Sequence, residues 1–183
     1  MPEIPLPDPP LRDGDLLLRP WSLDDVPAAM ELLQDPEIPR WTTIPPNYTE
    51  RDGREFMGGC AARRAAGETL DLAAVDADDG TLLGGIGLHK FDWEHAFGEM
   101  GYWVGAPARR RRVATRAVRL LGGYGLGELG LRRIEITVHV DNHASQRVAE
   151  RAGGIREGLD RREIGRHGMC DVVLFTLTRA PTP

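Results

Sequence analysis

The chain has 183 residues, a formal net charge of −5, and hydrophobic and charged fractions of 41% and 28%. These values are typical of a soluble globular protein with a sizeable core. The acidic balance argues against general nucleic-acid binding, which depends on excess Lys and Arg, and no apolar run is long enough to span a bilayer. Cys60 and Cys170 are too few and too far apart to predict a disulfide framework or a metal site. We therefore expect a cytoplasmic protein with no metal and no membrane or nucleic-acid partner.

Residues 1–13 are rich in proline and predict a mobile, extended tail in front of one domain over residues 14–180. Ser22 and Thr49 predict helix N-termini, because an aspartate three residues later completes a capping box in each case. The prolines of residues 38–48 predict a loop. The predicted elements in chain order are a strand over 15–21, helices after Ser22 and Thr49, strands over 69–77, 81–91 and 97–105, a helix after residue 112, a strand over 132–140, a helix over 141–154, and strands over 155–164 and 169–179.

The order of these elements predicts the fold class. Residues 132–140 alternate strictly between apolar and polar side chains, which is typical of a half-buried strand. The strand–helix–strand unit over residues 97–140 predicts a right-handed crossover between parallel neighbours, and the other strands are expected to pair antiparallel. We expect an α/β fold with a mixed, mostly antiparallel sheet and helices on both faces.

A run of four arginines, Arg109 to Arg112, stands directly before a predicted helix. The N-terminus of a helix exposes unpaired N–H groups and the positive end of the dipole, so cations are unfavourable there and phosphates are favoured. One interpretation is a site for a phosphate-bearing cofactor. The alternative is that the guanidinium groups point into solvent or contact nearby acidic groups.

Two stretches carry a family resemblance: "MGYWVGAPARRRRVATRAVRLL" over residues 100–121 and "LGLRRIEITVHVDNHASQRVAERAG" over residues 129–153. They resemble the RimJ/RimL-like branch of the GNAT N-acyltransferases, whose pattern includes R-x-x-G-x-A-T-x-A followed by N-x-x-S-x-R-V. The resemblance implies a sheet split between its fourth and fifth strands, with acetyl-CoA bound in the split. It also implies acetyl transfer to a primary amine, at a protein N-terminus or on a small molecule, by a monomer or homodimer.

The resemblance also implies the site residues on the coenzyme side. A backbone N–H near Val104, with those of Trp103 and Gly105 as alternatives, would polarise the thioester carbonyl. Arg109 and Ala114 take the outer positions of the phosphate-binding turn, whereas Arg112 stands where the family has glycine. The implied coenzyme-binding set is Trp103, Val104, Arg109, Arg110, Arg111, Arg112, Val113, Ala114, Thr115, Asn142 and Ser145.

Two residues are the candidates for proton transfer. By the resemblance, Ser145 would protonate the departing thiolate, although it can instead be only the third helical residue behind an Asn142 cap. Glu99 would accept the amine proton through water, with His89, Asp92 and His95 as other candidate bases. Trp41, Trp93 and Trp103 are candidate walls of an acceptor pocket.

Two departures from the family pattern support a second hypothesis. Besides Arg112, Gly154 stands where the family has an aromatic residue. These changes are compatible with a non-catalytic domain that senses acyl-CoA, so the sequence leaves both an enzyme and a sensor open.

Overall fold

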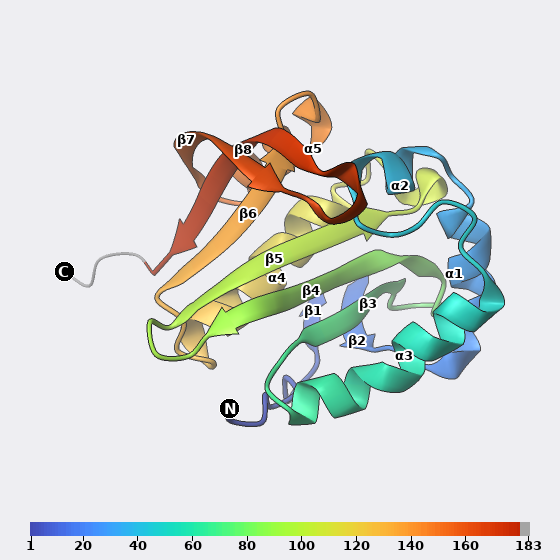
Figure 1. The fold of residues 1–183 in the computed structure, drawn as a ribbon. Coiled ribbons are helices and arrows are strands. Elements are labelled where there is room, and N and C mark those ends of the chain that lie inside the picture. The colour runs from blue at the N-terminus through green and yellow to red at the C-terminus, as the bar shows by residue number, and fades with distance from the viewer. Residues whose placement is uncertain (180–183) are drawn as a thin grey trace.

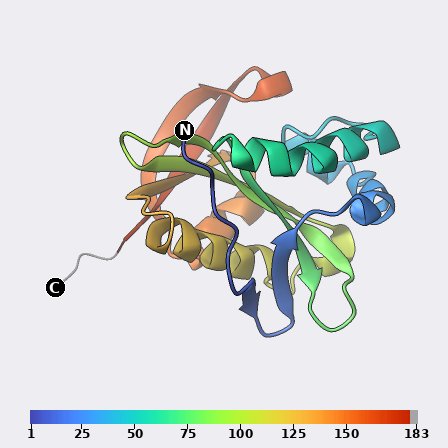
Figure 2. The ribbon, with the colours of Figure 1, turned by 90° about the horizontal axis from the view of Figure 1, so that it is seen from below.

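The computed structural model describes residues 1–179, which form one mixed sheet with helices on both faces (Figures 1 and 2). The strand order is β1-β2-β3-β4-β5-β6-β8-β7, and every neighbouring pair is antiparallel except β5 and β6. The expected fold class is therefore confirmed. The strands are β1 (Leu11–Asp13), β2 (Leu16–Pro20), β3 (Leu70–Asp76), β4 (Leu82–Asp92), β5 (Phe97–Val104), β6 (Arg133–His139), β7 (Ile155–Glu163) and β8 (Met169–Thr178).

Two helical layers enclose the sheet. The α-helices are α1 (Val26–Leu33), α2 (Glu37–Trp41), α3 (Glu50–Ala65), α4 (Val113–Gly127) and α5 (His143–Arg151), joined by the 3₁₀ turns η1 (Leu23–Asp25), η2 (Ala106–Ala108) and η3 (Gly165–His167). In Figure 2, α4 and α5 lie below the sheet and α1, α2 and α3 lie above it. Each layer covers its own core cluster, one containing Leu121 and Phe175 and the other Val26 and Met57. No helix of the described residues is long and apolar enough to cross a membrane.

The capping signals are confirmed. Ser22 and Thr49 each form a complete capping box, although Ser22 opens the turn η1, which leads into α1. The loop prediction is wrong in part, because α2 occupies Glu37–Trp41 within the proline-rich stretch. Pro39 is compatible with this helix because it lies in the first turn, where no intrahelical N–H bond is lost.

The N-terminal segment is extended, as its composition predicts, but it is docked onto the domain. Ile4 is fully buried, and its N–H donates to the carbonyl of Arg64 in α3 at 3.1 Å. The hydroxyl of Tyr124 in α4 donates to the carbonyl of Pro5 at 2.8 Å. Residues 11–13 then form β1 at the edge of the sheet, which the sequence analysis missed.

The sheet opens between β5 and β6. Their parallel ladder has three rungs, Phe97 with Arg133, Gly98 with Ile134 and Glu99 with Glu135. Beyond the third rung the strands continue to residues 104 and 139 without pairing with each other. If the short β1 is not counted, these are the fourth and fifth strands, so the split lies where the sequence analysis expected it.

Candidate active site

The open edge of β5 presents backbone groups to the split. The N–H of Gly105 donates to the carbonyl of Leu83 on β4 at 2.9 Å. Because backbone groups of successive residues in a strand point to opposite sides, the N–H groups of Trp103 and Gly105 face β4, whereas those of Tyr102 and Val104 face the split. Among the three N–H groups considered above, Val104 is therefore the one available to a ligand in the split.

The turn before α4 has an unusual backbone. Arg110 and Arg112 have φ values of 66° and 62°, in the left-handed region that non-glycine residues rarely adopt. Arg112 thus adopts the conformation for which glycine is suited at this position. It is the N-cap of α4 and forms no side-chain cap, and the first helical bond runs from the N–H of Arg116 to its carbonyl. The N–H groups of Val113, Ala114 and Thr115, which precede that bond, have no intrahelical acceptor.

The four arginine side chains form two groups, those that contact an acidic residue and those that do not. Arg109 lies 2.6 Å from the carboxylate of Asp35, and Arg111 lies 3.4 Å from that of Asp76. For these two, the interpretation as contacts with acidic groups is correct. The other two arginines are exposed and form no ion pair with any residue that the structure describes. These two residues, Arg110 and Arg112, are also the two whose backbone is left-handed.

Ser145 lies on the α5 side of the split. The side chain of Asn142 caps α5 by accepting from the N–H of Ser145 at 3.1 Å, so the capping interpretation is confirmed for this pair. The hydroxyl of Tyr102 on β5 lies 2.7 Å from the Ser145 hydroxyl and 3.2 Å from the Ser145 carbonyl, and its single proton can be donated to either oxygen. Burial raises the pKa of Tyr102 to about 12, although the bond to Ser145 lowers it in part. The phenol therefore stays protonated at neutral pH.

Sequence reasoning missed Tyr102. The signal that points to it is strand alternation, because Tyr102 shares the side of β5 with Val104, while Glu99 and Trp103 share the other side. Trp103 stacks on Trp21 with ring centroids 6.4 Å apart, under the α1 and α3 layer. Glu99 and Ser145 thus approach the split from opposite faces of the sheet.

Glu99 lies at the apex of the split, which is the point where the β5–β6 ladder ends and the two strands separate. Its carboxylate is 2.8 Å from the ammonium of Lys90 and 3.7 Å from the guanidinium of Arg162. It precedes Val104 by five residues, which corresponds to about 17 Å along a strand. A group held at the Val104 N–H can therefore reach this carboxylate only through water or another acceptor.

The other candidate bases differ in their surroundings. His89 is opposite Glu99 in the β4–β5 ladder, burial lowers its pKa, and its Nδ1 has no partner among the described residues. It is therefore neutral near pH 7. Asp92 and His95 pair with each other at 2.8 Å in the exposed turn between β4 and β5. They lie beyond the closed end of the split.

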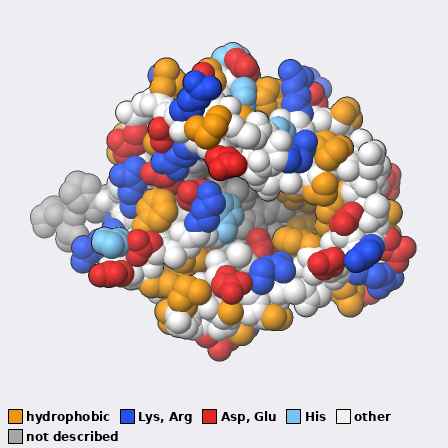
Figure 3. Space-filling view, viewed as in Figure 1, with side chains coloured by type: hydrophobic (Ala, Val, Ile, Leu, Met, Phe, Trp, Pro, Cys, Tyr) orange, Lys and Arg blue, Asp and Glu red, His pale blue; other side chains and the backbone are white. Residues whose placement is uncertain are grey.

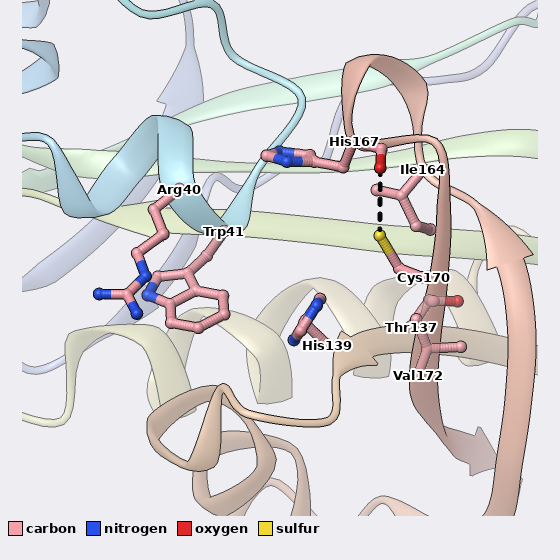
Figure 4. A pocket seen from close by; sticks show the side chains of 8 residues that line it. All are labelled: Arg40, Trp41, Thr137, His139, Ile164, His167, Cys170 and Val172. Atoms are coloured by element: carbon pink, nitrogen blue, oxygen red, sulfur yellow. Dashed lines mark hydrogen bonds between the residues drawn. The ribbon is translucent and has the colours of Figure 1, made fainter.

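A pocket lies between α2, β6 and the β7–β8 hairpin (Figure 4). Trp41 forms one wall of this pocket, with its ring centroid 5.3 Å from that of His139. Trp93 is not at this pocket, because it stacks on Phe91 and packs against the α4-side core. The complete lining is Arg40, Trp41, Thr137, His139, Ile164, His167, Cys170 and Val172. Among the described residues, no cluster of His, Cys, Asp and Glu is able to hold a metal ion.

Comparison with known proteins decides the family. The profile described as "Acetyltransferase (GNAT) domain" matches residues 15–155. The chain belongs to the GNAT acetyltransferase family. A Bacillus subtilis relative named "Putative ribosomal N-acetyltransferase YdaF" is 35% identical over 113 residues, which is 60% of this chain and 62% of that protein.

Solved structures of GNAT proteins share the fold. RimJ of Mycobacterium smegmatis, in complex with CoA-disulfide, has a TM-score of 0.78 at 23% identity and covers 94% of this chain and 88% of its own. The ribosomal-protein-S5-alanine acetyltransferase of Vibrio fischeri has a TM-score of 0.80 at 15% identity and covers 95% and 99%. GNAT acetyltransferases take their acyl group from acetyl-CoA, so this is the cosubstrate of the chain.

Proposed function

We propose that the protein transfers an acetyl group directly from acetyl-CoA to a primary amine, at the N-terminus of a protein or on a small molecule. One observation carries the proposal: the unpaired edge of β5 presents the Val104 N–H beside the hydrogen-bonded pair of Tyr102 and Ser145. The name of the Bacillus subtilis relative favours a ribosomal protein as the acceptor. A cytoplasmic location is part of the same proposal.

The turn at α4 has the features that a diphosphate requires. The free N–H groups of Val113, Ala114 and Thr115 and the positive end of α4 favour an anion. Arg110 and Arg112 have no ion pairs among the described residues, so their charges are available to phosphate oxygens. Acetyl-CoA would supply the acyl group as an activated thioester. In this proposal the chain holds its phosphates here and its carbonyl at the Val104 N–H.

Ser145 is proposed as the proton donor to the departing thiolate. Its hydroxyl gives up a proton only if another donor stabilises the oxygen, and the Tyr102 hydroxyl lies at 2.7 Å. Asn142 fixes the start of α5 and so fixes the backbone of Ser145. In this proposal Tyr102 positions Ser145, and both hydroxyls face the split.

The proposed proton acceptor for the amine is Glu99, acting through water. Its distance along β5 requires such a relay, because a base must come within hydrogen-bond reach of the proton or be joined to it by water. The pocket at Trp41 lies on the side of the sheet that carries Glu99, because its lining residues Thr137 and His139 share that side of β6 with Glu135, the ladder partner of Glu99. The face in Figure 3 is hollowed near its centre. The acceptor is proposed to approach from the side of the sheet that carries Glu99.

The sensor hypothesis loses one of its two supports. A Cβ on Gly154 would lie 2.8 Å from the carbonyl of Ala149 and 3.4 Å from the Cβ of Phe175. The absence of an aromatic residue at position 154 is therefore explained by local packing, and relaxed catalytic demand is not needed.

The test is release of thiol from acetyl-CoA and succinyl-CoA with three acceptor classes: N-terminal peptides of ribosomal proteins, polyamines and aminoglycosides. We expect acetyl-CoA turnover with at least one class, and loss of most of it in Ser145→Ala with unchanged CoA affinity in calorimetry. Tight CoA binding without turnover for any acceptor would favour the sensor.

A further inference from the structure

Two carboxylates face each other where the sheet begins to open. Glu99 and Glu135 form the last rung of the β5–β6 ladder, and their side chains are 14% and 7% exposed. Two negative charges with so little water around them repel each other, and burying such charges is costly unless they are paired with cations. The apex of the split therefore depends on the cations that reach it.

Three cations reach these carboxylates from different elements. In the part of the chain that the structure describes, Lys90, on a β-bulge of β4 with φ 50°, pairs with Glu99 and not with Glu135, whereas Arg133 pairs with Glu135 and not with Glu99. Among the described residues Arg162 alone contacts both, with its Nη1 2.7 Å from Glu135 and 3.7 Å from Glu99. Arg162 thus bridges the two strands that are about to separate.

Arg162 belongs to β7, outside this strand pair, and its guanidinium is itself held in place. Asp160, two residues earlier in β7, accepts from its Nε at 2.8 Å. The β7–β8 hairpin forms one edge of the sheet, and its tip reaches in front of the end of β5 toward α2 (Figure 1). There His167 Nε2 lies 2.8 Å from the carbonyl of Thr42 in the segment after α2. Ile164, His167 and Cys170 of the same hairpin line the pocket. The β7–β8 hairpin therefore joins the pocket wall to the apex through one continuous pair of strands.

We propose that Arg162 is a positioning residue that couples the acceptor pocket to the apex of the split. It acts through Glu99 and Glu135, so that the placement of the hairpin over the acceptor and the placement of the Glu99 carboxylate depend on each other. This inference rests on the proposed function, because it takes the Trp41 pocket as the acceptor side.

The test compares Arg162→Met and Arg162→Lys with the control Arg161→Met. Arg161 is the next residue in β7, 71% exposed, and its ion pair is with Asp171 at 3.8 Å on the hairpin itself. We expect Arg162→Met to raise the acceptor KM and to lower kcat by about tenfold to a hundredfold, with CoA affinity in calorimetry unchanged. Arg162→Lys retains the charge and should recover part of the loss, and Arg161→Met should behave as wild type.

A second measurement does not depend on turnover. Amide hydrogen exchange over residues 164–170 should be faster in Arg162→Met than in wild type, and unchanged in Arg161→Met. Adding Glu135→Gln to Arg162→Met removes the carboxylate charge that Arg162 no longer balances and leaves Arg133 as the remaining contact at this position. The double change should therefore lower activity by less than the sum of the two single changes. Equal behaviour of Arg162→Met and Arg161→Met in exchange and kinetics, or a parallel loss of CoA affinity, overturns the proposal. A wild type without acetyl transfer, but with the expected exchange pattern, would instead count against the proposed function.

Discussion

Arg112→Gly separates the two roles of the arginine that replaces the family glycine. The left-handed backbone costs an L-residue about 1–2 kcal/mol, and glycine avoids that cost. Glycine also loses about 0.5–1 kcal/mol through its greater freedom in the unfolded chain. The difference is a stabilisation of about 0.5–1 kcal/mol, which corresponds to a rise in Tm of about 1–4 °C for a chain of this size.

The same change has the opposite effect on the coenzyme. Arg112 is exposed and has no acidic partner among the described residues, so its loss removes a charge available to phosphate. Because solvent screens an exposed pair, we expect a loss of about 1 kcal/mol, a weakening of CoA affinity of about fivefold at low salt. This difference should shrink at high salt.

Thermal denaturation and calorimetry of CoA binding measure the two effects. Arg110→Gly, the other left-handed position, should also stabilise the protein, whereas Arg111→Gly removes the ion pair with Asp76 and should destabilise it. A lower Tm for Arg112→Gly would refute the backbone argument. Tighter CoA binding would show that the side chain obstructs the phosphate site, contrary to the proposed contact.

Three further changes test other parts of the structure. Tyr102→Phe removes only the hydroxyl that bonds Ser145, and we expect kcat to fall with little change in CoA affinity; steady-state kinetics with an unchanged kcat would contradict the positioning role. Ile4→Ala opens a cavity in a fully buried site and should cost about 2–4 kcal/mol in urea unfolding, whereas a freely mobile tail predicts no loss. Burial alone would raise the pKa of Asp25, but hydrogen bonds from Arg19 and the Ser22 N–H hold it below its usual value. A depressed carboxylate pKa adds stability above the unfolded value near 4 and loses it as pH falls, so Asp25→Asn should destabilise at pH 7 and become equal to wild type in acid melts.

Local patterns in the sequence were sufficient for most of the fold. Alternation identified β6, the capping boxes identified the starts of η1 and α3, and the position of the arginine run identified the start of α4. The elements that were missed carry weak local signals. Residues 11–13 are too short to show alternation, and the prolines at 36 and 39 conceal α2 because proline is favoured both in loops and in first helical turns.

The candidate site was predictable only where it follows from one segment. The phosphate-binding turn and the edge of β5 lie within the motif that carries the family resemblance. Tyr102 and Ser145 are 43 residues apart in sequence, and Arg162 comes from a third strand that folds back over Glu99. Such contacts depend on how the elements pack, and no periodicity within a single segment encodes them.

The docked N-terminal segment has a consequence for how the molecule can be shortened. The segment passes the edge of the sheet (Figure 2) and contacts a helix on each face: Ile4 bonds to α3 on one face, and Pro5 bonds to α4 on the other. A truncation that starts at the first full strand would remove one contact from each helical layer and expose the part of the core that Ile4 covers. The helix whose first turn is proposed to grip the coenzyme would then lose an anchor at its far end.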